Sequence, residues 1–314
     1  MTPRYLEAMR SGVLTERIAA ARELLSPCRL CPRQCGVDRL AGERGYCRTG
    51  ELVEVASYGP HFGEESVLVG RGGSGTIFFC GCNLLCTFCQ NYEISRASDP
   101  DCRTVDDEEL GAIMVELQES GCHNINFVTP THVVPQILAA LPHAIRRGLR
   151  VPLVYNCGGY ERMESLRLLD GILDIYMPDA KFWERESGRR YAKAPDYPAV
   201  MRAALTEMQR QVGDLQVNAK GLAERGLLVR HLLMPEGLSE AVAIFQFIAE
   251  EISHSCYINI MDQYRPCGEA ALQGEGEIIS RAMLDEAIRA AEKAGLSRFD
   301  ERDMASFIRR LMLR

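Results

Sequence analysis

Short apolar runs alternate with longer amphipathic stretches along the chain from residue 76 onward. The apolar runs are rich in β-branched and aromatic residues and are predicted strands; they lie at residues 76–79, 125–128, 151–155, 173–177, 227–233 and 257–261. The stretches after them have helical composition and are predicted helices; they lie at residues 107–117, 133–147, 162–169, 199–212, 240–252 and 281–294. Six successive strand–helix units predict a parallel sheet with right-handed crossovers.

The N-terminal part of the chain has a different pattern. Residues 14–25 have helix-forming composition, and Ser26 and Pro27 are expected to end this helix. A glycine-punctuated segment follows with four cysteines in a C-x2-C-x3-C-x11-C pattern; they are Cys28, Cys31, Cys35 and Cys47. Four thiolates on tightly wrapped loops suit a closed site, and zinc, a single iron and an iron–sulfur cluster all remain open. The alternative is four reduced cysteines without a metal.

The composition is that of an ordinary globular protein. With 314 residues and 46% hydrophobic content, the chain can bury a substantial core in one large domain, with or without a small appendage. We expect a helix and metal-binding segment over residues 1–55 and the main domain over residues 56–314. The charged N-terminus lacks a signal core and no run approaches the ~20 apolar residues that cross a bilayer, so a cytoplasmic location is expected. The net charge of −7 argues against a nucleic-acid partner held by phosphate contacts.

The chain contains 13 cysteines, and without a secretion signal these indicate metal ligands in a reducing compartment more than disulfides. Cys82, Cys86 and Cys89 form a C-x3-C-x2-C pattern directly after the first predicted strand. Three thiolates on one short loop can hold three irons of a cubane cluster and leave the fourth iron open for a small ligand. A zinc knuckle and three unrelated thiols are the alternatives.

This motif, with the aromatic Phe88 before its last cysteine, resembles the cluster motif of radical S-adenosylmethionine (SAM) enzymes. Residues 73–91 are similar to the branch typified by pyruvate formate-lyase activating enzyme. The resemblance implies a partial (β/α)6 barrel of the TIM type, and a [4Fe-4S] cluster whose open iron chelates SAM. It also implies that an electron from the reduced cluster splits SAM into methionine and a 5'-deoxyadenosyl radical, which abstracts a substrate hydrogen.

In barrels and open parallel sheets, chemistry takes place at the C-terminal ends of the strands. After the second predicted strand, the resemblance implies a Gly-Gly-Glu-type segment that meets the amino group of SAM, but this chain has Thr129 and Thr131 there. Oxygens of both threonines can accept the same hydrogen bonds, with capping of a helix by Thr131 as the alternative. Asn156 ends the third strand beside two glycines, which let a backbone approach a ligand closely or merely shape the turn.

Charged residues end the fourth and fifth predicted strands. Asp179 and Lys181 are similar to an acid and a lysine of glycyl-radical activating enzymes that line the cofactor and substrate cavity. Arg230 resembles a family position that pairs with the SAM carboxylate, a task that suits a guanidinium group. Internal ion pairs are the alternative for all three residues. His231 points to the opposite face of its strand and is expected to pack.

Phe88 of the motif and Met261 at the end of the sixth predicted strand complete the expected SAM pocket. Cys80, Cys157 and Cys267 also lie near strand ends, and a thiol there can donate a hydrogen atom to a substrate radical. We retain Cys267 as a catalytic candidate, although buried cysteines are more often small hydrophobic residues.

A glycine-bracketed loop ahead of the first predicted strand holds His61 beside Glu64 and Glu65. This group is either a metal ligand or proton relay near the cluster, or a solvated surface feature.

The prediction is thus a radical SAM oxidoreductase served by an electron donor such as a flavodoxin or a ferredoxin. The activating-enzyme resemblance suggests a glycyl residue of a partner enzyme as the substrate, while a small molecule or another peptide stays open. The alternative from another class is an iron–sulfur electron carrier or a metal-binding interaction module, in which both cysteine groups are structural.

Overall fold

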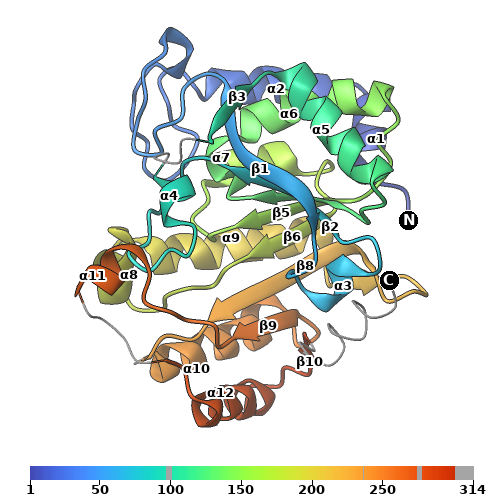
Figure 1. Cartoon of the computed structure of the whole chain (residues 1–314). Coiled ribbons are helices and arrows are strands. Elements are labelled where there is room, and N and C mark those ends of the chain that lie inside the picture. The colour runs from blue at the N-terminus through green and yellow to red at the C-terminus, as the bar shows by residue number, and fades with distance from the viewer. Residues whose placement is uncertain (97–100, 236, 274–277, 301–314) are drawn as a thin grey trace.

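The structure is a computed structural model that describes residues 1–96, 101–235, 237–273 and 278–300 (Figure 1). Within these residues the centre is a sheet of ten strands in the order β10-β9-β8-β6-β5-β4-β2-β1-β3, with β7 beside β8. The strands from β10 to β2 along this order are parallel; they are β10 (Arg298–Phe299), β9 (Tyr257–Met261), β8 (Ala223–Leu232), β6 (Ile175–Pro178), β5 (Leu153–Cys157), β4 (Ile125–Val128) and β2 (Ser74–Phe79). The predicted parallel sheet is confirmed, and this mixed α/β fold is consistent with a partial (β/α)6 barrel.

Every helix predicted to follow a strand is present; these are α5 (Asp107–Glu119), α6 (Val134–Arg146), α7 (Met163–Leu169), α9 (Tyr197–Val212), α10 (Leu238–Phe247) and α12 (Arg281–Lys293). Helix α5 is capped at its N-terminus by Asp106, whose side chain accepts a hydrogen bond from the Glu109 backbone N–H at 2.8 Å. Helices that the sequence analysis did not predict are α1 (Arg4–Arg10), α3 (Ser66–Val69), α4 (Tyr92–Ser95), α8 (Arg185–Ala192) and α11 (Gly268–Gln273). No helix in the described part of the chain is long and apolar enough to cross a lipid bilayer.

One edge of the sheet is antiparallel and was not predicted. Strand β1 (Val53–His61) runs against β2 and against the short β3 (Arg103–Val105), and β7 (Gln216–Val217) runs against β8. The residues around His61 were expected to form a loop because glycines bracket them. Strand β3 pairs with β1 at Val53 to Val55, so Pro60 lies where β1 has β2 on one side and no β3 partner on the other. His61 is therefore the end of a strand.

The N-terminal helices belong to the same core as the parallel sheet. Helix α2 (Val13–Glu23) packs on α6 and α7, and α1 packs on α2 and α6 (Figure 1). Tyr5 is fully buried and its hydroxyl donates a hydrogen bond to the Val151 carbonyl at 3.0 Å. The division of the chain between residues 55 and 56 stays a prediction.

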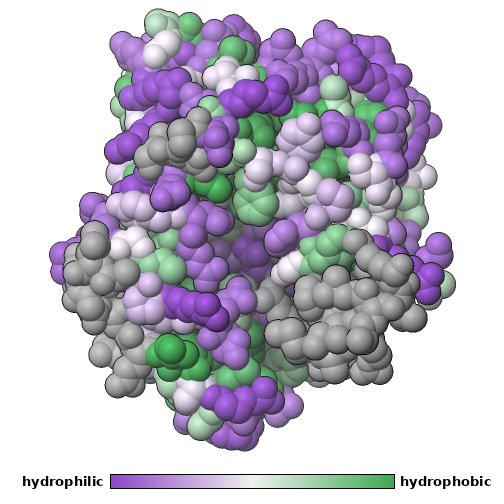
Figure 2. Space-filling model, viewed as in Figure 1, coloured by the Kyte–Doolittle hydropathy of each residue, from purple (hydrophilic) through white to green (hydrophobic). Residues whose placement is uncertain are grey.

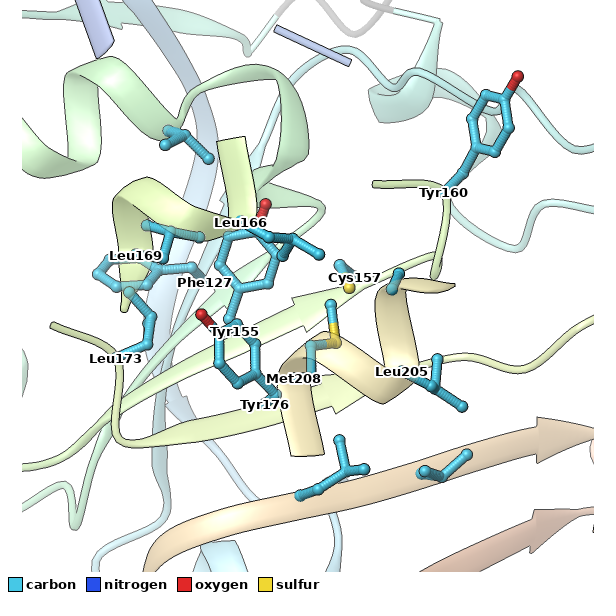
Figure 3. Packing of buried hydrophobic residues seen from close by; sticks show 14 of the residues in the cluster. Phe127, Tyr155, Cys157, Tyr160, Leu166, Leu169, Leu173, Tyr176, Leu205 and Met208 are labelled. Carbon is cyan, nitrogen blue, oxygen red and sulfur yellow. The ribbon is translucent and has the colours of Figure 1, made fainter. Parts of the chain in front are cut away.

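Aromatic side chains pack between the parallel strands and the helices that cover them (Figure 3). Phe127 of β4, Tyr155 of β5 and Tyr176 of β6 lie against Leu166 of α7 and Met208 of α9 (Figure 3). Burying an aromatic side chain of this size contributes roughly 1.5–3 kcal/mol. This packing fixes the strands, and with them the side chains at the strand ends.

Candidate active site

A cavity of about 600 Å³ lies where the cysteine loop meets the C-terminal ends of the parallel strands. Its wall includes the three motif cysteines and most of the predicted strand-end residues; these are Cys82, Cys86, Phe88, Cys89, Thr129, Asn156, Asp179, Lys181, Arg230 and Met261. The face shown in Figure 2 is hollowed near its centre, and hydrophilic residues lie in the depth of the hollow. The structure therefore brings together residues from six separate strand–helix units around one space.

Between β2 and the cysteine loop lies Gly81, a position where no larger residue fits. Gly81 has φ +88°, and a Cβ atom there would lie 2.3 Å from the Cys47 carbonyl oxygen. In the loop, the Leu84 backbone N–H donates to the Cys82 sulfur at 3.3 Å, and the Cys89 N–H donates to the Cys86 carbonyl at 3.2 Å. Phe88 packs against Phe182, Tyr191 and Tyr264, with ring centroids about 6 Å apart. The loop is thus held by backbone bonds and by aromatic packing.

Burial controls the charge of two motif thiols, Cys82 and Cys86. It raises the pKa of Cys82 to about 11 and that of Cys86 to about 12, while the nearby Lys181 ammonium lowers both. Cys82 and Cys86 are therefore protonated at neutral pH, and a metal that binds them would displace their protons.

In the described residues, no group of three or more histidine, cysteine, aspartate or glutamate side chains is already placed to hold a metal ion. The donor chemistry of the loop nevertheless fits a [4Fe-4S] cluster. Three soft thiol donors follow one strand, a backbone N–H points at one sulfur, and the cavity adjoins all three thiols.

A network of charged groups also lines the cavity. The Asp179 carboxylate lies 2.5 Å from the Lys181 ammonium and 2.7 Å from Arg230 Nε. Arg230 also donates to the Asn156 side-chain oxygen at 2.6 Å, and its Nη1 lies 4.0 Å from the Glu64 carboxylate. Strands β6 and β8 create this arrangement, because a backbone bridge sets Asp179 beside Arg230. The internal ion pairs considered as the alternative are present, on side chains that also line the cavity.

This network fixes the protonation states of its members. Burial alone would favour the neutral acid at Asp179, but Arg230 and Lys181 together lower its pKa below the ordinary value. Burial opposes the charge of Lys181, yet Asp179 and Cys86 raise the pKa of the ammonium above its ordinary value. Asp179 is therefore a carboxylate and Lys181 an ammonium at neutral pH.

His61 ends β1 on the cavity wall, 3.0 Å from the Glu64 carboxylate through its Nδ1. The hydrogen bond to Glu64 raises the pKa of His61 above its ordinary value. Glu65 lies away from this pair and accepts a hydrogen bond from the Asn259 side chain at 2.7 Å. Of the two acids that follow His61, Glu64 is thus the one that shares the cavity wall with the cysteine loop.

The two threonines have different positions. Thr129 lies on the cavity wall with φ +59°, and its backbone N–H donates to the Asn156 carbonyl at 2.9 Å. Thr131 is almost fully buried, away from the wall, and its hydroxyl donates to Glu161 at 2.6 Å. It also does not cap α6, whose N-terminal cap residue is Val133. The Thr131 hydroxyl is therefore taken by Glu161 away from the cavity wall, and a contact of Thr131 with SAM stays a prediction.

Glu161 is a buried acid that the sequence analysis missed. Its carboxyl group receives hydrogen bonds from Thr131, from the Tyr155 hydroxyl at 3.0 Å and from the Cys157 thiol. Burial raises the pKa of Glu161 to about 7, although these three donors lower it. Cys157 lines the cavity, so this acid lies directly behind the cavity wall.

The remaining cysteine candidates are partly corrected by the structure. Cys80 forms a disulfide with Cys102, so it is no hydrogen-atom donor, and the expectation of reduced cysteines is wrong for this pair. The cavity wall in the described residues includes Arg265 and leaves out Cys267. The backbone after Cys267 is held against the Tyr92 ring, where a Cβ on Gly268 would lie 2.3 Å from that ring. His231 is buried as expected and packs against Phe245.

Comparison with known proteins agrees with this geometry. The sequence model of the Radical SAM superfamily matches residues 76–211, which extend from β2 into α9. An uncharacterized protein of Methanocaldococcus jannaschii is 31% identical over 303 residues, which cover 93% of this chain and 82% of that protein. With its cysteine loop at the end of the first parallel strand and a polar cavity beside it, the chain belongs to the radical SAM superfamily.

Proposed function

We propose that this protein is a radical SAM oxidoreductase whose Cys82, Cys86 and Cys89 hold a [4Fe-4S] cluster for the reductive cleavage of SAM. The observation that carries the proposal is that all three thiols line one cavity of about 600 Å³ together with the polar ends of β4, β5, β6 and β8. A closed structural metal site would not need such a cavity.

The residues of the wall would bind and orient the cofactor. When bound, the cluster and SAM supply an electron and an adenosyl radical that abstracts hydrogen from a substrate. Arg230 would bind the SAM carboxylate, and its orientation is fixed by Asp179 and Asn156. The side-chain oxygen of Thr129 would accept from the SAM amino group, while Phe88 and Met261 provide apolar wall.

The substrate proposal rests on Asp179 and Lys181. Both charged groups lie on the cavity wall, 2.5 Å apart. The similarity to glycyl-radical activating enzymes implies that these two residues line the cofactor and substrate cavity. We therefore propose a glycyl residue of a partner enzyme as the substrate and a flavodoxin or a ferredoxin as the electron donor. A second metal site at Cys28, Cys31, Cys35 and Cys47 is part of the same proposal.

The test of the cluster assignment is anaerobic reconstitution with iron and sulfide, followed by reduction and electron paramagnetic resonance (EPR) spectroscopy with and without SAM. We expect the signal of the reduced cluster to change when SAM is added, because SAM binds the open iron. The Cys82/Cys86/Cys89→Ala variant should lack this SAM-dependent change. A reducible cluster whose EPR spectrum does not change when SAM is added would refute the proposal. It would support the alternative that the protein is an electron carrier.

The substrate has a separate test. Co-purification with a glycyl-radical enzyme, and a backbone-centred radical on that enzyme after reaction with SAM, would support the activase proposal. Turnover of a small molecule without any such partner would contradict it and leave the SAM chemistry intact.

A further inference from the structure

The N-terminal cysteine segment is bound directly to the catalytic cysteine loop. Arg33, between Cys31 and Cys35 in the sequence, donates from its Nε to the carbonyl oxygen of Asn83 at 2.9 Å. Asn83 is the residue that follows Cys82. The other guanidinium nitrogens of Arg33 donate to the carbonyls of Ala192 and Lys193 at 2.7 and 2.6 Å. One side chain thus joins the two cysteine groups.

Tyr46 lies between the same two groups. Its ring stacks on the Arg33 guanidinium, whose central carbon is 4.2 Å from the ring centroid, and its backbone N–H donates to the Cys35 sulfur at 3.3 Å. Cys82 and Cys86 both interact electrostatically with its phenol group. An aromatic ring therefore extends from a ligand candidate of the N-terminal group towards the catalytic loop.

The backbones of the two groups also touch. The Cys47 carbonyl oxygen fills the space that a side chain at Gly81 would need, and Gly81 precedes Cys82. Behind this contact, the buried Arg39 donates to the His132 carbonyl at 2.8 Å, and a ring nitrogen of His132 is 2.8 Å from the Cys80 carbonyl. The contact is therefore part of the core and has a fixed geometry.

The N-terminal thiols differ in their exposure to solvent. Cys28, Cys31 and Cys47 are buried, each with 7% of its surface exposed, while Cys35 is exposed. All four thiols interact electrostatically through Cys31, and backbone N–H groups of Arg33 and Tyr46 point at the Cys31 and Cys35 sulfurs. Such donors stabilise thiolates that bind a metal and tune the reduction potential of an iron–sulfur cluster.

We propose that Cys28, Cys31, Cys35 and Cys47 hold a redox-active iron–sulfur cluster that passes electrons from a low-potential donor protein to the catalytic cluster site. The inference rests on the proposed function, because the electron acceptor is the cluster on Cys82, Cys86 and Cys89. One electron enters at the exposed Cys35 side and leaves across the Arg33 and Tyr46 contact. The donor is oxidised and the catalytic cluster is reduced by one electron, while no bond forms and no proton moves. Zinc could not serve here, since it has no redox chemistry.

Metal content gives the first test. The Cys82/Cys86/Cys89→Ala variant leaves the N-terminal group as the one complete cysteine set, and it is reconstituted anaerobically with iron and sulfide in the presence of zinc. We expect bound iron and sulfide with a cluster EPR signal after reduction by titanium(III) citrate. Zinc in place of iron, no metal, or iron that titanium(III) cannot reduce would each overturn the proposal.

The second test measures electron entry into the catalytic cluster by stopped-flow absorbance. Cys28→Ser/Cys31→Ser should lose fast reduction by reduced flavodoxin but keep reduction by titanium(III) citrate, with Cys122→Ser as a buried-cysteine control. Because Cys28 lies in the core, Arg33→Met is measured in parallel; it should retain its iron and show flavodoxin-driven reduction slowed by about tenfold or more. Arg33→Lys keeps the positive charge but lacks the planar guanidinium group, and it should recover part of the rate of flavodoxin-driven reduction.

Equal flavodoxin-driven rates in the native protein and in both variants would overturn the relay. Absence of SAM cleavage in every protein with titanium(III) citrate would instead refute the proposed function. The two failures are distinguishable because the first concerns how the electron arrives and the second concerns what the reduced cluster does.

Discussion

Replacement of Asp179 by asparagine removes the negative charge at the centre of the cavity wall. Asp179→Asn keeps the size of the side chain but leaves the Lys181 ammonium and the Arg230 guanidinium, now 2.5 and 2.7 Å from the carboxylate, without their counter-charge. Both cations then repel each other across an amide group.

The expected cost follows from the burial of the three groups. Their side chains are 11%, 15% and 16% exposed for Asp179, Lys181 and Arg230, so solvent screens them weakly. Removing one partner of a buried ion pair costs about 3–5 kcal/mol, and we expect the lower end because the asparagine oxygen can still accept one hydrogen bond. Asp170→Asn is the matched control: its carboxylate is 30% exposed and pairs with Arg4 and with Arg210, and a partly exposed pair of this kind contributes about 1 kcal/mol or less.

The pH dependence of the protein's stability gives an independent test of the charge on Asp179. The pKa of Asp179 is lower in the folded protein than its ordinary value of 3.8, because Arg230 and Lys181 outweigh burial. Its contribution to stability is therefore present at neutral pH and is lost as the pH falls below about 4. Asp179→Asn should show a smaller loss of stability on acidification than the native protein.

Urea unfolding of both variants and the native protein, followed by circular dichroism at neutral and acidic pH, measures these effects. An Asp179→Asn cost within about 1 kcal/mol of the Asp170→Asn cost would refute the assignment of a buried, charged network. An unchanged acid dependence would refute the protonation states.

Two further predictions concern the loop and the buried acid. Gly81→Ala should destabilise the fold by at least about 1–2 kcal/mol, because residue 81 has a positive φ. The new methyl group would also displace the Cys47 carbonyl, so less iron should be bound after reconstitution. An unchanged iron content would contradict this prediction. The pKa of Glu161 is about 7 in the folded protein, above its ordinary value of 4.5. Between these two pH values the folded protein keeps a proton on Glu161 that the unfolded chain has released. The free energy of unfolding therefore falls as the pH rises from about 4.5 to about 7. Glu161→Gln should remove that fall in melting temperature between pH 5 and pH 8, and an equal fall in both proteins would count against the assignment.

The sequence predicted those parts of the fold in which local pattern and packing agree. The strands at 125–128 and 257–261 have the predicted bounds. Short, largely apolar runs such as these are typical of strands in a parallel sheet that is covered on both faces. Strand β1 was missed because Gly59 and Pro60 are loop signals, and its pairing with β2 is a long-range contact that no local pattern encodes.

The site was predictable to the extent that it depends on strand ends. The residues Asn156, Asp179 and Arg230 could be found because parallel strands end at one edge of the sheet. Glu161 and the Cys80–Cys102 disulfide were not found, since a buried acid and a particular cysteine pairing follow from tertiary packing. Arg33 was missed for the same reason: its partner Asn83 lies 50 positions along the chain.

The most direct test of the account is SAM cleavage by the reconstituted and reduced protein. Native protein given titanium(III) citrate and SAM should form 5'-deoxyadenosine and methionine in equal amounts, and the Cys82/Cys86/Cys89→Ala variant should form neither. Product from both proteins, or a native protein with a reducible cluster that does not bind SAM, would contradict the claim that this cysteine loop is the catalytic centre.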